Sequence, residues 1–112
     1  MDLVEVQDGE TWEQALLALP HNHILQSFAW GEFKSRHGWE VRRLLWRGGK
    51  IPRAAAQVLT RRVGPFRMAY VPRGPALDYE DAALLEEVLA ALEEGARAGG
   101  ATSARALSST GI

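Results

Sequence analysis

The chain has no cysteine among its 112 residues. Disulfides and thiolate metal sites are therefore excluded, although this absence does not by itself indicate a cellular compartment. Long apolar runs are also missing, since no segment approaches the roughly 18 residues needed to span a bilayer. The first ten residues are acidic, whereas a signal peptide begins with basic and then apolar residues. We therefore expect a cytoplasmic protein.

Acidic side chains are absent from one long stretch. Residues 41–77 hold nine basic side chains and no acidic one, whereas residues 1–40 and 78–112 each hold two basic and seven acidic ones. The net charge of -1 hides this segregation. Unmixed cations attract anions such as phosphates. The alternative is that arginines at strand ends only keep a sheet soluble and protect its edges. Those arginines are Arg42, Arg43, Arg61 and Arg62.

Motifs of several enzyme classes are absent as well. No P-loop, GxGxxG pattern or serine nucleophile elbow occurs, so NTPase, dinucleotide-binding and hydrolase functions have no support. His21, His23 and His37 have no carboxylate or cysteine at metal-ligand spacing beside them. We expect these histidines to cap helices or contact solvent, and we expect no metal and no cofactor.

Hydrophobic spacing in the first third of the chain predicts one strand and two helices. Residues 2–7 alternate apolar and polar side chains, as a strand does. Asp8 and Ser27 are candidate N-caps of helices over 9–19 and 28–37, which Pro20 and a left-handed Gly38 would end. In the second helix we expect the aromatic side chains to bury most of the apolar area. These are Phe28, Trp30 and Phe33.

The remainder predicts an antiparallel meander followed by a helix. Strand-length runs over 39–47, 51–62 and 66–72 are separated by glycine-containing turns. The last helix has Asp78 and Asp81 as competing N-caps and ends at a glycine pair. One stripe of this helix is apolar. It consists of Leu84, Leu85, Val88, Leu89, Leu92 and Ala96.

The predicted fold class is α+β, with the order β-α-α-β-β-β-α and a possible further strand. The mainly antiparallel sheet would be flanked by helices. We expect one domain over residues 1–101. Residues 102–112 would be a frayed or disordered tail unless their first few residues pair as a strand.

Two segments could bind an anion. Lys34 follows Trp30 by four residues on one helix face, so its side chain would pack against the indole ring. Packing of this kind could hold the ammonium in place for phosphate. The alternative is that the lysine stem only covers the indole. In "YVPRGPALD", residues 70–78, Arg73, Gly74 and the following helix N-terminus could together form an anion cradle. The alternative is a strand-to-helix corner in which Arg73 pairs with Asp78.

The combination of "QSFAWGEFK", "AAAQVL" and "YVPRGPALD" resembles the N-terminal part of the Fem family of peptidoglycan-branching aminoacyltransferases. The resemblance covers about residues 20 to 100. It implies a GNAT-like (acyl-CoA N-acyltransferase-like) half-domain and transfer of an amino acid from aminoacyl-tRNA to a muramyl-pentapeptide precursor, either UDP-linked or lipid-linked. It further implies that Lys34 and Arg73 bind the diphosphate. Tyr70 and Asp78 would border the precursor site, where Asp78 contacts substrate or caps the helix.

Family members are several times longer than this chain, so the resemblance implies a truncated or short homologue that is inactive alone. No catalytic residue can be assigned. The alternative function is a non-catalytic binding or assembly module that forms a homo-oligomer through an open sheet edge. General nucleic-acid binding rests on the basic stretch alone, and the overall pI of 6.3 ranks it last.

Overall fold

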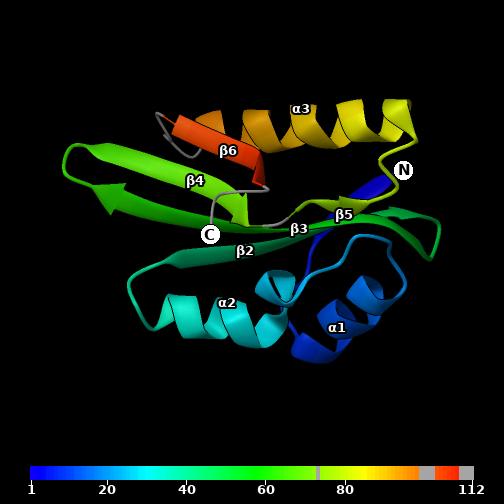
Figure 1. The fold of residues 1–112 in the computed structure, drawn as a ribbon, viewed down its shortest axis with the longest axis horizontal. Helices are drawn as coiled ribbons and strands as arrows, with labels where there is room; N and C mark the ends of the chain where they lie inside the picture. Colours follow the sequence, from blue (N-terminus) through cyan, green and yellow to red (C-terminus); the bar gives the residue numbers. More distant parts are fainter. Residues whose placement is uncertain (73, 99–102, 109–112) are drawn as a thin grey trace.

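The computed structural model describes residues 1–72, 74–98 and 103–108 of the chain. A six-stranded sheet lies between two helical layers, with α1 and α2 on one face and α3 on the other (Figure 1). The molecule measures 40 × 27 × 24 Å along its principal axes. In chain order the elements are β1 (Asp2–Glu5), α1 (Gly9–Leu17), η1 (Ile24–Gln26), α2 (Phe28–Ser35), β2 (Glu40–Gly48), β3 (Ile51–Val63), β4 (Phe66–Pro72), β5 (Ala76–Leu77), α3 (Ala82–Ala98) and β6 (Ser103–Ser108).

The sheet has the strand order β1-β2-β3-β4-β6, and the short β5 pairs with β3 beyond the end of β4. All strand pairs are antiparallel except β4 with β6. The predicted meander of β2, β3 and β4 is therefore confirmed. Its two turns contain Gly49 and Gly64 with φ of 64° and 60°, a left-handed conformation that glycine adopts without steric cost.

Both predicted caps of the first two helices are confirmed. An oxygen of Asp8 accepts a hydrogen bond from the Thr11 N–H at 2.9 Å, and the Ser27 hydroxyl accepts one from the Trp30 N–H at 3.1 Å. Between these helices, the His23 imidazole accepts from the Leu25 N–H and begins the one-turn helix η1, which was not predicted. His23 thus has the capping role expected for it.

Each face of the sheet has its own apolar core. Trp12, fully buried in α1, packs with Leu16 of the same helix and Leu45 of β2, and its indole N–H donates to the Gln26 carbonyl at 2.7 Å. On the opposite face, Val88 of α3 packs with Trp46 of β2. Burying side chains of this size stabilises the fold by about 1.5 to 3 kcal/mol each. The helical layers are thereby attached to both faces of the sheet.

The prediction for the buried face of α2 was wrong in part. Phe33 is 42% exposed, and the residue of α2 that is buried is Gly31. Beneath Gly31, Arg43 and Gln57 of the sheet form a buried polar contact, in which the Arg43 Nε donates to Gln57 Oε1 at 2.9 Å. Gln57 Nε2 in turn donates to the Ser27 carbonyl at 3.0 Å. These hydrogen bonds and the packing of Phe28 against the core, rather than the ring of Phe33, hold α2 on the sheet.

The C-terminal segment carries a strand. Ser103–Ser108 pairs with β4 in parallel, which is the alternative that the sequence left open for the first residues of the tail. The boundary between domain and tail at residues 101 and 102 stays a prediction, since residues 99–102 and 109–112 lie outside the described part. Over the residues that the structure describes, no helix combines the length and the apolar character needed to cross a membrane.

Candidate functional site

The C-terminus of α2 brings Lys34 and Trp39 together. Gly38 adopts φ of 90°, as predicted, and the Trp39 N–H donates to the Lys34 carbonyl at 3.2 Å, which closes the helix end. The Lys34 ammonium then lies 5.0 Å from the centre of the Trp30 ring and 5.7 Å from that of Trp39. None of the ion pairs found between described residues involves Lys34. Its charge is thus positioned by two indoles and is available to an anion.

Trp39 also contacts two residues of the sheet. Its ring meets that of Tyr70 edge to face at 5.3 Å between centroids, and the Arg61 guanidinium lies 5.4 Å from the Trp39 centroid. Burial raises the pKa of Tyr70 further above its ordinary value near 10. Its phenol, protonated at neutral pH as any tyrosine is, can donate a hydrogen bond. We call Trp30, Lys34, Trp39, Arg61 and Tyr70 the aromatic–cation cluster. It gathers two cations and one hydroxyl from α2, β3, β4 and the turn before β2.

The structure brings together two of the four predicted site residues. Lys34 and Tyr70 both contact Trp39. Asp78 is exposed and follows Leu77, which pairs with Ala54 of β3, whereas Tyr70 pairs with Leu59. Those two pairs stand five positions apart along β3, which is roughly 17 Å at the usual rise. Asp78 therefore lies away from the cluster.

Arg73 lies outside the described residues, so its predicted convergence with Lys34 stays a prediction. The residues beside it are placed, and they correct the role expected of Gly74. That glycine is buried, and a Cβ there would come within 2.6 Å of Gln26 Nε2 and 3.0 Å of Val71 Cγ1. The absent side chain of Gly74 thus accommodates Gln26 of η1, not the approach of a ligand.

The expected helix N-terminus for anion binding is also corrected. β5 intervenes between the proline-glycine turn and α3, which was not predicted. The cap of α3 is Asp81, whose Oδ1 accepts from the Leu84 N–H at 3.1 Å, while Asp78 accepts from the Glu80 N–H at 3.0 Å in a tight turn. Asp81 also pairs with Arg53 at 3.1 Å. A carboxylate already occupies the end of this helix, so it is closed to an external anion.

The basic stretch is partly neutralised in three dimensions. Arg42 pairs with Glu5 at 2.9 Å, Arg53 with Asp81 at 3.1 Å, and Arg67 with Glu40 at 3.7 Å. Acidic residues from both flanking segments therefore fold back onto the basic one.

Arg43 was expected at an exposed strand end, and this was wrong. It is 7% exposed, its guanidinium lies 3.9 Å from the Phe28 ring centre and donates to the Phe28 carbonyl, and burial lowers its pKa. Arg43 is therefore a structural link between β2 and α2.

Two members of the cluster, Trp39 and Arg61, were not predicted. A sequence signal for Trp39 was present, because the residue after a left-handed glycine at a helix end commonly packs back on the last turn. Arg61 had no comparable signal. Its contact with Trp39 depends on the register that pairs Glu40 with Thr60, which no local pattern specifies.

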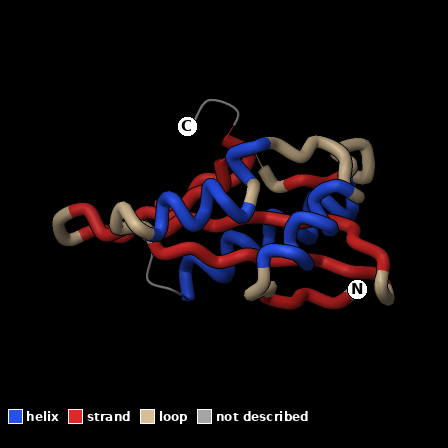
Figure 2. The backbone as a smooth tube through the Cα atoms, turned by 90° about the horizontal axis from the view of Figure 1, so that it is seen from below, coloured by secondary structure: helices blue, strands red, loops and turns tan. Residues whose placement is uncertain are grey.

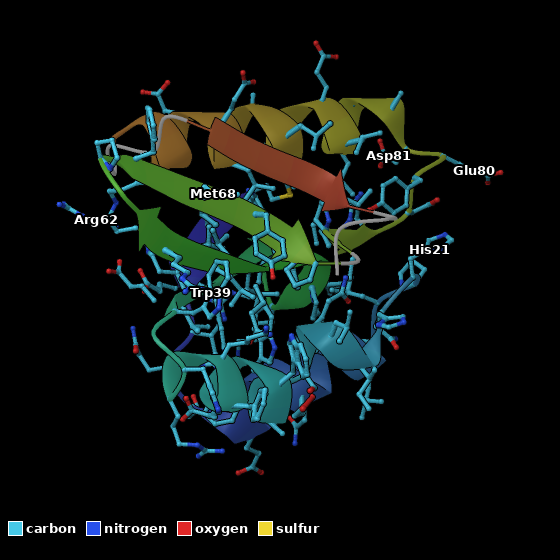
Figure 3. The ribbon with its side chains drawn as sticks, turned by 60° about the vertical axis from the view of Figure 1, so that its left-hand side comes forward. His21, Trp39, Arg62, Met68, Glu80 and Asp81 are labelled. Carbon is cyan, nitrogen blue, oxygen red and sulfur yellow. The ribbon has the colours of Figure 1, made fainter. Side chains whose placement is uncertain are left out.

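Figure 3 shows how the ends of the molecule differ. Trp39, Met68 and Arg62 lie toward one end, and His21, Glu80 and Asp81 lie toward the other. The aromatic–cation cluster thus places two cations, Lys34 and Arg61, and the Tyr70 hydroxyl near the Trp39 indole. Together these groups can bind and orient an anion with an attached polar group.

Comparison with known proteins gives consistent results. The sequence model of the FemAB family matches residues 10–106. The lipid II:glycine glycyltransferase of Staphylococcus haemolyticus (strain JCSC1435) is 34% identical over 84 residues, covering 72% of this chain and 20% of that protein. The enzyme of the same name from Staphylococcus aureus (strain bovine RF122 / ET3-1) is 34% identical over 82 residues, which is 70% of this chain and 19% of that protein.

Among solved structures, the crystal structure of FemX superposes with a TM-score of 0.79 and 26% sequence identity, covering 90% of this chain and 25% of the other. The chain thus spans about a fifth of the length of the curated relatives and a quarter of FemX. Because the family model covers most of the sequence, the chain belongs to the FemAB family.

Proposed function

We propose that this chain forms the part of a FemAB-type aminoacyltransferase that binds the diphosphate of a muramyl-pentapeptide precursor. The observation that carries the proposal is the Lys34 ammonium, held between Trp30 and Trp39 and unpaired with any described carboxylate. A lysine fixed in this way acts as a point charge for phosphate. The names of the staphylococcal relatives, lipid II:glycine glycyltransferases, support a precursor of this class.

The neighbours of Lys34 suit a diphosphate with an attached sugar. Arg61 supplies a second cation within 5.4 Å of the Trp39 ring centre. The protonated Tyr70 phenol can donate to a further oxygen, and the indole faces can pack against a sugar or another flat group. By family resemblance we include Arg73 in the same site. Asp78 would act only as an outer polar contact.

The reaction of the complete site would be attack of the precursor's amine on the ester of an aminoacyl-tRNA. The amine displaces the tRNA hydroxyl, a base removes the amine proton, and hydrogen-bond donors stabilise the oxyanion that forms. We assign neither a base nor an oxyanion donor to the described residues. We therefore propose precursor binding, and not turnover, as the activity of this GNAT-like part on its own.

The test is calorimetric titration of the chain with UDP-muramyl-pentapeptide. Replacing Lys34 by alanine removes a charge-assisted contact of about 1.5 to 3 kcal/mol, so we expect binding to weaken by about ten- to hundred-fold. Lys50→Ala, in the turn at the far end of β3, is the matched control and should leave the affinity unchanged. Absence of binding, or an equal loss in the two variants, would refute the proposal.

A further inference from the structure

The turn between β3 and β4 projects beyond the helical layers at one end of the molecule. Figure 1 shows this hairpin extending past α2 and α3, and Figure 2 shows the same turn as the outermost loop on that side. Directly after the turn stands Phe66, which is 57% exposed. A large apolar ring at the tip of a protruding hairpin is not needed for the core of the fold.

The apolar surface continues from the tip along one face of the sheet. Phe66, Met68 and Tyr70 alternate along β4, so their side chains share the face on which Tyr70 meets Trp39. Met68 is 40% exposed. Phe33 of α2, at 42% exposure, stacks on Trp30 of the aromatic–cation cluster at 5.5 Å between ring centroids. The exposed apolar groups are therefore continuous with the aromatic–cation cluster.

Two cations lie near these apolar groups, one on each face of the hairpin. Arg61 pairs with Met68 in the strand register, and Arg62, the next residue of β3, pairs with Arg67 one position before the turn and lies on the other face of the strand. Neither Arg61 nor Arg62 takes part in an ion pair found among the described residues. The nearby Glu40 pairs with Arg67 at 3.7 Å. The exposed carboxylates of α3 lie on the face opposite Phe66, Met68 and Arg61, and Arg62 shares their face.

We propose that this end of the molecule docks on an anionic lipid bilayer, with Phe66 and Met68 entering the interface and Arg61 and Arg62 contacting lipid phosphates. Aromatic and other apolar side chains flanked by basic ones are the combination that binds bilayer surfaces, where the rings leave water and the cations meet anionic headgroups. This inference rests on the proposed function, since a lipid-linked precursor is presented at a bilayer. Docking here would bring the aromatic–cation cluster to the headgroups.

The absence of native cysteine allows a direct test. Phe66→Cys and Ile51→Cys would each be labelled with an environment-sensitive fluorophore and mixed with vesicles of phosphatidylglycerol or of phosphatidylcholine, without precursor. Ile51 is 67% exposed at the opposite end of β3, so it is the matched control. We expect a blue-shifted, brighter signal only for the label at position 66, and only with phosphatidylglycerol.

Cosedimentation of unlabelled protein with vesicles measures how much the apolar and the basic side chains each contribute to binding. Phe66→Ser with Met68→Ser should weaken binding to phosphatidylglycerol by about ten-fold or more, and Arg62→Gln by about five-fold. Lys50→Gln with Ile51→Ser should leave it unchanged. No vesicle binding, equal responses at both ends, or binding to single-stranded RNA in place of vesicles would overturn the inference. Because no precursor is present, these results are independent of the Lys34 titration.

Discussion

Gly31 lies in the middle of α2, where its missing side chain leaves room for polar groups from the sheet. A Cβ at this position would lie 2.3 Å from Gln57 Oε1 and 2.5 Å from the Arg43 guanidinium. Both partners are buried and hydrogen-bonded, so neither can move away without losing a contact. The position of α2, and with it that of Lys34, depends on this close approach.

Gly31→Ala should therefore lower the free energy of unfolding by about 1 to 3 kcal/mol, because overpacking outweighs the higher helix propensity of alanine. Gly95→Ala in α3 is the matched control, since no described atom lies within 4 Å of its added Cβ, and it should raise stability by about 0.5 to 1 kcal/mol. Urea denaturation measures both changes. Equal effects of the two substitutions would show that the contact with Gln57 and Arg43 has no energetic role.

At the scale of elements, α3 depends on the residue that begins it. Asp81 satisfies the Leu84 N–H and pairs with Arg53 of β3, so it joins the helix to the sheet. Asp78 makes only the short-range bond to the Glu80 N–H. The two acids are three residues apart, but Asp81 caps α3, whereas Asp78 stabilises only the turn before it.

We expect Asp81→Ala to destabilise the protein by about 1 to 2 kcal/mol, most of it from the lost cap and less from the exposed ion pair. Asp78→Ala should cost under about 0.5 kcal/mol, as is usual for a surface substitution. Thermal unfolding, monitored by circular dichroism, compares the stabilities of the two variants. A larger loss in the Asp78 variant would contradict the assignment of the cap.

At the scale of the whole molecule, each face of the sheet carries one of the two tyrosines. Tyr70 lies beside Trp39 on the α2 side, and Tyr79 packs against the core under α3 while its hydroxyl donates to the Pro75 carbonyl. Burial raises the pKa of both phenols above the ordinary value near 10. The folded state thus retains these two protons to higher pH than the unfolded chain does.

The stability that comes from keeping the Tyr70 and Tyr79 phenols protonated is present in full below pH 10. It is lost as the pH rises through the elevated native pKa values. The free energy of unfolding should fall above pH 10, and the fall should be smaller in the Tyr70→Phe and Tyr79→Phe double variant. Urea titrations at pH 8 to 11, with phenolate absorbance recorded in parallel, measure this. Stability that rises across that range in the unmodified chain would refute the prediction.

Most elements could be predicted from short segments. Asp8, Ser27 and Gly38 act within one helical turn, and the two glycine turns act between adjacent strands, so the first two helices and the meander followed from local pattern. η1 and β5 were missed because two or three residues carry no periodic signal. For the site, Lys34 and its contact with Trp30 could be predicted at helical spacing, but Arg61 could not. The assembly module proposed as an alternative stays a prediction, since oligomerisation has not been tested.

Local chemistry was thus sufficient to specify where the chain turns and where its first two helices are capped, because those interactions join residues a few positions apart. Three-dimensional packing decided which cations remain available to a ligand. Arg42 meets Glu5 across 37 residues and Arg53 meets Asp81 across 28, whereas Lys34 and Arg61 face the same indole without a described carboxylate partner. Electrostatic energy depends on distance in space and on burial, and neither can be read from the order of residues.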